Sequence, residues 1–222
     1  MRLMKISKFK AFIREFPYLN QSFDIKKKNW KIKHLQQKID KIFGENDAVT
    51  LNRFELKNSK NNLESFIFKT LMWGYPTKGR GKNIENILEK GNLEKLIKIL
   101  ENYQDQEITI EQLKSDIKSV SGLGLSTMTK FTQFLNTTID GNKAVIIDNQ
   151  IIEVINTERF EEFNHLKGIS YGNALKNYQE YLNTVNKLSN NINVEPEQIE
   201  IFLFMFGKYL SEIDGENCYD YD

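Results

Sequence analysis

Two amphipathic segments flank a short glycine-containing turn near the middle of the chain, and this feature most constrains the fold. Thr109 is a favourable N-cap, and Gln112 three residues later fits a capping box. The apolar residues that follow recur at the spacing of one helical face: Leu113, Ile117 and Val120. Gly122 and Gly124 surround Leu123, and glycine tolerates the positive φ that a sharp reversal requires. We expect a helix, a hairpin with Leu123 buried, and a second helix.

The second helix is expected to begin directly after this turn. Ser126 and Thr127 are start signals, and an apolar face follows, made of Met128, Phe131, Phe134 and Leu135. The backbone N–H groups from Gly124 to Thr127 would then be unpaired at a helix N-terminus, where the helix dipole favours an anion. The sequence therefore predicts a phosphate site at the hairpin.

A short apolar run downstream ends at a carboxylate, Ile146-Ile147-Asp148. The next segment, 149–155, has the pattern of a helix, so Asp148 is expected at or near its N-cap. A carboxylate is favoured there by unpaired N–H groups and by the macrodipole. The alternative is that Asp148 serves only as a structural cap.

The loop Gly74–Asn83, GYPTKGRGKN, is the second stretch whose residues suit a binding function. It places aromatic Tyr75 beside three basic residues, Lys78, Arg80 and Lys82. Its glycines allow close backbone approach, which suits a sugar-phosphate backbone or a stacked base. The alternative is a plain helix connector with solvated basic side chains. The spacing does not match a P-loop, so nucleotide hydrolysis is not inferred.

The formal net charge is only +1, although DNA-binding proteins are often distinctly basic. The charges are unevenly distributed along the chain. Basic residues gather at Lys26, Lys27, Lys28, Lys31 and Lys33 and again in 77–82, whereas the tail 212–222 is acidic. This pattern indicates a dipolar surface; the alternative is an ordinary mixture of solvated charges.

Composition excludes several classes of protein. The single cysteine, Cys218, cannot form an internal disulfide, and with only two histidines no zinc cluster is available. No apolar run approaches the length of a membrane span, and the N-terminus lacks the pattern of a signal peptide. We expect a cytoplasmic protein with no metal cluster and no membrane association.

Further amphipathic helices are predicted at 30–43, 63–73, 93–100, 172–188 and 196–210. The segment 48–56 reads as a short strand or an extended loop, and 1–29 gives no clear element. The predicted fold class is all-α, with two helical lobes and a central cleft. We expect a single domain over the 222 residues, with the hairpin in a lobe of roughly 63–156.

The G-L-G hairpin, its following helix and the Ile146-Ile147-Asp148 run resemble the helix-hairpin-helix DNA glycosylase superfamily, which includes 8-oxoguanine glycosylase and endonuclease III. The four-cysteine iron-sulfur loop of many endonuclease III relatives is absent. The segment Leu71-Met72-Trp73-Gly74-Tyr75-Pro76 and the pair Thr129-Lys130 are similar to a smaller bacterial group of 8-oxoguanine DNA glycosylase (OGG) fold proteins. Some members of that group are encoded in antiphage operons, including type IV CBASS.

This resemblance implies a DNA N-glycosylase that excises a damaged or modified purine of the 8-oxoguanine type. Asp148 matches the carboxylate that stabilises the cationic sugar as the glycosidic bond breaks. In bifunctional members a lysine attacks the sugar carbon and forms a Schiff base, which permits β-lyase activity. Aligned without gaps from the hairpin, this lysine falls on Ser126, as it does in monofunctional adenine glycosylases.

Lys130 is the alternative source of the amine. It lies four residues beyond Ser126, about 6 Å along a helix axis, and helical side chains lean toward the N-terminus. An extended Lys130 side chain is therefore expected to bring its amine back over Ser126. The competing interpretation is a solvated lysine on an amphipathic helix.

The resemblance also assigns binding roles around the hairpin. The amides of Gly122, Gly124 and Ser126, with Thr127, are expected to contact a DNA phosphate. Independently of the resemblance, Tyr75 is the first candidate for stacking on the extruded base, because it lies in the basic loop. A K⁺ or Na⁺ bridging hairpin and phosphate is implied at three backbone carbonyls, those of Lys118, Val120 and Leu123. No other cofactor is expected.

Two other functions remain open from the sequence. One is a non-catalytic accessory protein of a defence operon, which keeps the glycosylase fold to bind nucleic acid or a partner protein. Near-neutral charge and Ser126 at the lysine position favour this interpretation. The other is a helical protein whose G-L-G hairpin is coincidental. Nothing in the residues decides which base would be recognised.

Overall fold

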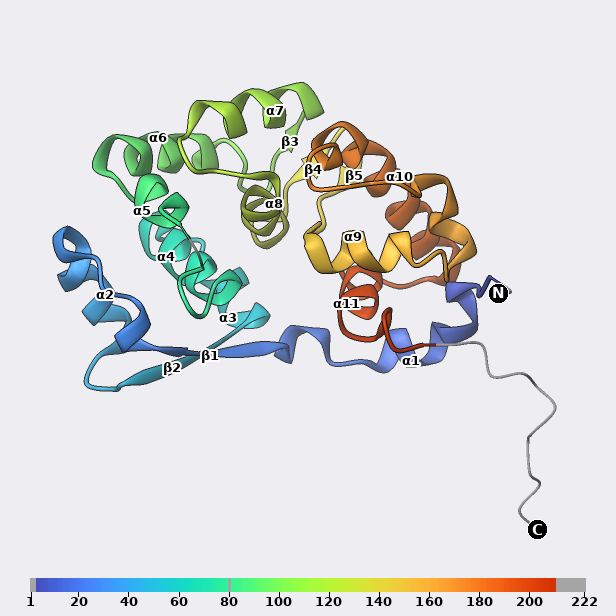
Figure 1. Cartoon of the computed structure of the whole chain (residues 1–222), viewed down its shortest axis with the longest axis horizontal. Coiled ribbons are helices and arrows are strands. Elements are labelled where there is room, and N and C mark those ends of the chain that lie inside the picture. Colours follow the sequence, from blue (N-terminus) through green and yellow to red (C-terminus); the bar gives the residue numbers. More distant parts are fainter. Residues whose placement is uncertain (1–2, 80, 211–222) are drawn as a thin grey trace, which may run out of the picture. The chain divides into compact units, whose positions relative to one another are not determined.

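The computed structural model describes residues 3–79 and 81–210. The chain divides into two compact units (Figure 1). Unit 2 comprises Pro17–Asp148, and unit 1 comprises the residues on either side of it. The predicted hairpin lobe therefore falls in unit 2 as far as Asp148, and the helix that follows Asp148 belongs to unit 1.

Unit 2 is mostly helical with two small sheets. In the first sheet β1 (Ser22–Lys26) pairs antiparallel with β2 (Ala48–Asn52), with Phe23 opposite Leu51 and Ile25 opposite Val49. In the second, β4 (Thr138–Ile139) lies between parallel β3 (Glu107–Ile108) and antiparallel β5 (Asn142–Lys143). The helices are α2 (Gln36–Phe43), α3 (Arg53–Asn58), α4 (Leu63–Gly74), α5 (Asn83–Ile87), α6 (Lys90–Glu101), α7 (Ile110–Ser119) and α8 (Leu125–Phe134). Short 3-10 turns are η2 (Tyr18–Asn20), η3 (Lys27–Asn29) and η4 (Lys33–Leu35).

Unit 1 is built from helices and one isolated β-bridge between Met4 and Phe160. Its elements are η1 (Ile6–Phe9), α1 (Lys10–Glu15), α9 (Asn149–Asn156), η5 (Glu161–Leu166), α10 (Ala174–Ile192) and α11 (Pro196–Phe206). The rings of Phe9, Phe12 and Phe16 pack on Phe202 and Phe206 of α11. This aromatic cluster joins the N-terminal helix to the C-terminal one within unit 1.

The expectation of an all-α fold is wrong in detail, because two sheets accompany the helices. The longest strand pair, β1 and β2, lies in segments with few apolar residues, where apolar and polar residues alternate over only a short stretch. Ile25 and Leu51 are buried, whereas their neighbours Asp24 and Thr50 are exposed and joined by a hydrogen bond of 2.6 Å. Each segment alone gives a weak signal, and pairing satisfies the backbone groups of both.

Most predicted helices are present, and the clearest error is the start of the first one. The segment 30–43 is helical only from Gln36 onward, since Trp30 and Ile32 precede a 3-10 turn as buried anchors. The helix ends as predicted at Gly44, which has φ +56°. No described helix is long and apolar enough to cross a membrane.

The hairpin between α7 and α8 forms where the sequence predicts it. The hydroxyl of Thr109 accepts the amide of Gln112 at 3.1 Å, which caps α7. Gly122 has φ +83°, and Leu123 is buried. Helix α8 begins at Leu125 with Gly124 as its N-cap, so Ser126 lies within the first turn and does not cap it.

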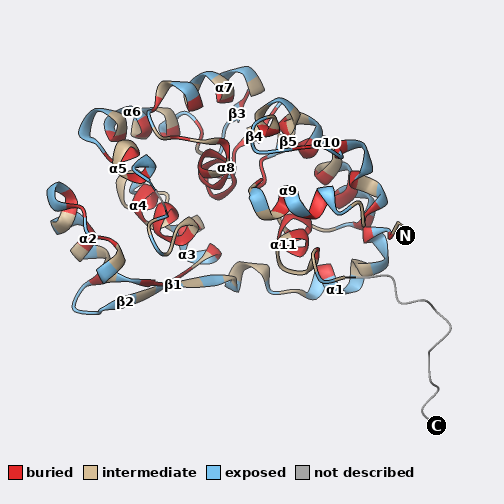
Figure 2. Ribbon diagram, viewed as in Figure 1, coloured by how far each residue is buried: buried red, intermediate tan, exposed pale blue. Residues whose placement is uncertain are grey.

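Helix α8 is the buried centre of unit 2, and Figure 2 shows it in red along its length. Helix α4 packs on it through aromatic pairs. The Phe66 and Phe131 ring centroids are 5.9 Å apart, and those of Trp73 and Phe134 are 5.2 Å apart in an edge-to-face arrangement. The last residue of α4, Gly74, lies against the Lys130 side chain of α8.

Candidate functional site

Lys130 is the chemically most distinctive residue of α8. Its side chain is buried, with 5 % of the residue exposed, so the interpretation as a solvated surface lysine is wrong. The Nζ atom donates to the Ser126 hydroxyl at 2.9 Å and to the Ser126 carbonyl at 3.0 Å. These distances confirm that the amine reaches back over Ser126, whereas its role as a nucleophile stays a prediction.

The end of α4 forms one wall around the Lys130 side chain. A Cβ atom added at Gly74 would lie 2.9 Å from Lys130 Cδ and 3.0 Å from Cε, so a larger residue there would force the lysine stem to shift. The ammonium lies 5.6 Å from the centroid of the Tyr75 ring, within cation–π range. The Tyr75 hydroxyl bonds to the hydroxyl of Thr127 at 2.7 Å. Tyr75 is thus held against α8, with its ring facing the amine.

The segment before Asp148 runs along a different side of α8. The Ile147 amide donates to the Thr129 hydroxyl at 3.3 Å, and the Ile146 amide donates to the Gln133 side-chain carbonyl at 2.8 Å. Asp148 follows Ile147 directly, and Lys130 follows Thr129 directly. Two hydrogen bonds of unit 2 therefore hold the segment before Asp148 against α8, at the residue next to Lys130 and at the residue three beyond it.

Asp148 is half-buried and is the last residue of unit 2. Helix α9 begins at Asn149, as predicted from the sequence. A carboxylate and an amine have complementary roles in chemistry at a sugar carbon. The carboxylate can stabilise positive charge there, and the amine can attack it when deprotonated.

The hairpin gives α8 an N-terminus with open backbone donors. Across residues 3–79 and 81–210, the N–H groups of Gly124, Leu125 and Ser126 form no hydrogen bond. The Thr127 amide differs, since it donates to the Gly124 carbonyl at 3.1 Å, so the expectation that it is unpaired is wrong. The open donors suit an anionic oxygen.

Gly122 has a structural role as well as a predicted binding role. A Cβ atom there would lie 2.5 Å from the backbone oxygen of Asn83, at the start of α5. The hairpin therefore packs directly on the backbone of the segment that follows the basic loop. Its positive φ and this contact both require glycine.

The three carbonyls predicted to hold a monovalent cation lie around the same turn. Val120 and Leu123 are buried, and the Val120 carbonyl accepts the Leu123 amide at 3.2 Å. Lys118 is exposed. The neighbouring Ser119 carbonyl accepts the Lys95 ammonium at 3.0 Å, which places a positive charge at this end of α7. Cation binding by these carbonyls stays a prediction.

The basic loop is partly neutralised by an ion pair. The Lys78 ammonium lies 2.7 Å from the Glu85 carboxylate, and this hydrogen bond is the main cause that lowers the Glu85 pKa. Lys82 is exposed. The prediction for Arg80 falls outside the described residues. Of the three basic residues predicted to bind nucleic acid, Lys78 is therefore already engaged by a carboxylate.

Sequence reasoning missed the polar side chains that organise α8. Thr129 and Gln133 are buried and hold the segment that leads to Asp148. The Gln133 amide nitrogen, the Thr70 hydroxyl and the Trp73 indole nitrogen are buried, with no hydrogen-bond partner among the described residues. The signal was a set of polar residues at i, i+1 and i+4 (Thr129, Lys130 and Gln133) beside the apolar face of the helix.

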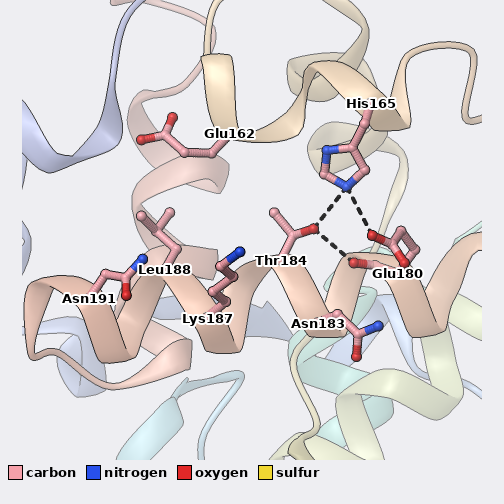
Figure 3. A pocket seen from close by; sticks show the side chains of 8 residues that line it. All are labelled: Glu162, His165, Glu180, Asn183, Thr184, Lys187, Leu188 and Asn191. Carbon is pink, nitrogen blue, oxygen red and sulfur yellow. Dashed lines mark hydrogen bonds and ion pairs between the residues drawn. The ribbon is translucent and has the colours of Figure 1, made fainter.

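Unit 1 has a separate pocket of about 460 Å³ between η5 and α10. Figure 3 shows the His165 ring pointing at α10, with Nε2 3.0 Å from the Thr184 hydroxyl and 3.3 Å from the Glu180 carboxylate. Its lining mixes both charges, with Lys187 beside Glu180 and Glu162. This pocket contains no residue of the predicted site, and its chemistry favours no ligand class.

Two comparisons with known proteins gave no match, and one gave a match over most of the chain. Residues 17–204 match the model of the family described as "Putative 8-oxoguanine DNA glycosylase OGG-like protein". No curated protein and no solved structure matches the chain. The matched range includes all of unit 2 and hence the hairpin, Lys130 and Asp148.

Proposed function

Since the chain belongs to the OGG-like 8-oxoguanine DNA glycosylase family, we propose that it is a DNA N-glycosylase that excises a damaged or modified purine. The observation that most supports this proposal is the hydrogen bond of the Ile147 amide to Thr129, which holds the segment before Asp148 on α8 at the residue that precedes Lys130. The open amides at the N-terminus of the same helix supply a site for the phosphate of the nucleotide.

In the proposed reaction the target nucleotide leaves the base stack, because its glycosidic bond is inaccessible within a duplex. The bond's electron pair departs with the base, and positive charge develops on the sugar. The Asp148 carboxylate stabilises that charge. A water molecule then bonds to the anomeric carbon and loses a proton, which gives a free base and an abasic site.

In the proposed lyase reaction, the Lys130 amine replaces water as the nucleophile. Its neutral amine would bond to the anomeric carbon as the base departs, and loss of a proton with ring opening would give a Schiff base. Elimination of the 3′ phosphate then cuts the strand. The amine lies 2.9 Å from Ser126 Oγ, and Ser126 is where the ungapped alignment puts the family's lysine. This location supports Lys130 as the amine donor.

Excision is tested with duplexes that carry 8-oxoguanine, other oxidised or alkylated purines, or modified phage bases. After incubation and heating in alkali, the wild type is expected to cleave at the modified base. Asp148→Asn is expected to lose this cleavage, whereas Glu94→Gln, an exposed carboxylate on α6, should retain it. Absence of cleavage by the wild type on every substrate would remove the enzyme proposal.

The lyase step is tested separately by borohydride trapping. Wild type and Lys98→Ala, which changes an exposed lysine on α6, are expected to form a covalent adduct with the substrate strand. Lys130→Ala is expected to form none. Base excision that persists in Lys130→Ala without an adduct in any variant would assign the protein to monofunctional glycosylases.

A second function is supported by Ser126 at the lysine position and by the engagement of Lys130 with two oxygen atoms of Ser126. In this case the protein binds DNA, or a partner protein of a defence operon, without chemistry. DNA binding that is unchanged in Asp148→Asn, together with no turnover by the wild type, would support it.

A further inference from the structure

Unit 2 contains an open pocket that is distinct from the Lys130 site. Its volume is about 720 Å³, and its lining comes from η3, η4, the first residue of α2 and the segments next to them. The lining residues are Lys27, Lys28, Lys31, Lys33, Gln36 and Asp47. We name this feature the lysine pocket. Four of its six lining side chains are cationic.

The backbone around the lysine pocket is fixed by buried apolar anchors. Trp30 is fully buried and Ile32 is 5 % exposed, whereas Lys31 between them and Lys33 after them are exposed. The Lys27 amide donates to the Asp47 carbonyl at 2.8 Å, which ties η3 to the start of β2. The alternation of anchors and lysines therefore presents the ammonium groups from a rigid wall.

Most of this positive charge is not compensated within the protein. The Lys27 ammonium lies 3.2 Å from the Asp40 carboxylate. Among the ion pairs of residues 3–79 and 81–210, none involves Lys28, Lys31 or Lys33. Like charges held near one another repel, and an anionic ligand relieves this repulsion. The lysine pocket is therefore suited to a ligand that carries several negative charges.

A hydrogen bond connects the segment that carries the pocket lysines to the loop that reaches the candidate site. The Asn29 side-chain amide donates to the Pro76 carbonyl at 3.4 Å. Pro76 follows Tyr75, whose hydroxyl bonds to Thr127 on α8. Hydrogen bonds and two short chain segments thus connect the lysines to the helix that carries Lys130, all within unit 2.

The charge of the whole unit agrees with an extended anionic ligand. Unit 2 contains 21 Lys and Arg residues against 16 Asp and Glu residues, whereas the rest of the chain contains 10 against 14. The formal net charge of +1 therefore combines a basic unit 2 with an acidic unit 1. Phosphate contacts by such lysines supply sequence-independent affinity for a nucleic acid.

We propose that the lysine pocket binds the sugar-phosphate backbone of the substrate DNA, away from the nucleotide at Lys130. This proposal rests on the proposed function, since that function makes DNA the ligand. Lysine acts as a flexible point charge toward phosphate, so an open pocket of lysines holds a backbone without reading its sequence. Lys28, Lys31 and Lys33 are the residues assigned to this contact.

The test measures the equilibrium binding of a fluorescent 20-base-pair duplex to the full chain by anisotropy, at a series of KCl concentrations. The test variant is Lys28→Gln/Lys31→Gln/Lys33→Gln. The control is Lys90→Gln/Lys98→Gln/Lys176→Gln, which removes the same charge from exposed lysines elsewhere. The slope of log K against log salt is expected to fall by about 3 in the test variant, with affinity at least about tenfold weaker at 0.1 M salt. A slope equal to that of the control would overturn the proposal.

Competition distinguishes the DNA backbone from other anions. An unlabelled duplex should displace the labelled one, whereas inorganic phosphate and polyglutamate at matched ionic strength should not. Displacement of the duplex by micromolar phosphate, or tight binding of polyglutamate lost only in the test variant, would overturn the assignment to DNA. The first result would indicate a small-anion site and the second an acidic protein partner.

Single-turnover excision at saturating protein separates this proposal from the proposed function. The test variant should reach the wild-type rate constant once the DNA is saturated, because the lysine pocket holds no reacting atom. Weak DNA binding by the test variant, with no excision by the wild type, would remove the glycosylase proposal alone. Excision by the wild type, with unchanged DNA binding by the test variant, would remove the lysine-pocket proposal alone.

Discussion

Lys130 lies where it does because Gly74 has no side chain. The methylene groups of Lys130 pass the end of α4 close to the place that a Cβ atom of residue 74 would occupy. The Lys130 ammonium then lies near Ser126 and the Tyr75 ring. The residue thus combines a buried stem with a polar head that has defined partners. A group used for attack on carbon needs such a fixed location, since misplacement by about 1 Å can lower a rate about 100-fold.

Gly74→Ala is expected to reduce trapping of the protein-DNA adduct at least about tenfold, because the new methyl group displaces Lys130 Cδ and Cε. The free energy of unfolding should change by less than about 1 kcal/mol, since alanine is the better helix former. Gly91→Ala on α6 is the control, because a Cβ atom there meets nothing within 4 Å. Adduct yield and thermal unfolding of both variants check this, and equal yields from both would contradict it.

The ion pair of Lys78 with Glu85 gives a second prediction at this scale. Glu85→Gln is expected to release the Lys78 ammonium for contact with a phosphate, which should strengthen DNA binding. The slope of log K against log salt should become steeper by about 1, as expected for one additional phosphate contact. Glu89→Gln, an exposed carboxylate in the same region, removes equal charge without touching Lys78. Anisotropy titrations at several salt concentrations compare the two. Equal salt slopes would show that Lys78 does not contact DNA.

At the scale of elements, the hairpin is held by its contact with α5 as much as by its own turn. Gly122 lies against the Asn83 backbone, and the buried Leu123 completes the packing. This arrangement links the open amides of α8 to the segment that follows the basic loop. Damage to the turn should therefore affect both elements that we propose to bind DNA.

Gly122→Ala is expected to lower the free energy of unfolding by about 2–4 kcal/mol, from positive φ and from the approach of its Cβ to the Asn83 oxygen. Gly141→Ala is the matched control, since Gly141 has a similar φ of +78° and open space around it. It should cost about 1 kcal/mol. Urea denaturation measures both, and equal losses would mean that the close contact contributes nothing.

At the scale of the molecule, the two units carry formal net charges of opposite sign, and the pKa values of certain carboxyl groups are shifted in opposite directions in the two units. In unit 2 hydrogen bonds hold the pKa of three carboxyl groups below the usual range: Gln36 acts on Asp40, Lys78 on Glu85 and Lys60 on Asp105. These groups add stability above the ordinary carboxyl pKa and lose it as the pH falls. In unit 1, burial raises the pKa of Glu162. Protonation of Glu162 is therefore easier in the folded state.

Unit 2 is accordingly expected to open before unit 1 as the pH is lowered from 7 to below 4. The stabilisation of the folded state by protonated Glu162 is fully present below the ordinary glutamate pKa of 4.5. It is lost as the pH rises through the raised pKa of Glu162 in the folded protein. Hydrogen exchange along a pH series should show protection lost first in α4 and α8. Glu162→Gln should remove the acid-dependent gain in protection of η1, whose Ile6 amide bonds to Glu162 at 2.9 Å. Loss of protection in α10 before α8 would contradict this order.

Helix caps, glycine turns and apolar periodicity predicted the elements whose formation depends mainly on residues close together in the sequence. Thr109 caps the start of α7, and Gly44 and Gly122 supply the positive φ of the turns where they lie. The long helices α4, α10 and α11 are detected by the helical period of their apolar residues. The β1–β2 pair was ambiguous because a short strand is stabilised by a partner about 26 residues away, as between Asp24 and Thr50. Helix spacing also predicted the reach of Lys130 over Ser126.

What the sequence by itself determined is the hairpin, the helix that carries Lys130 and the approach of that amine to Ser126, because helix geometry and glycine conformations are local. Only the tertiary structure decided that Lys130 is buried, that Gly74 makes room for it, and that Thr129 anchors the segment ending at Asp148. It also brought the lysine segment to the Tyr75 loop. These contacts join residues far apart in the chain, and their stability comes from packing and hydrogen bonds that no local pattern encodes.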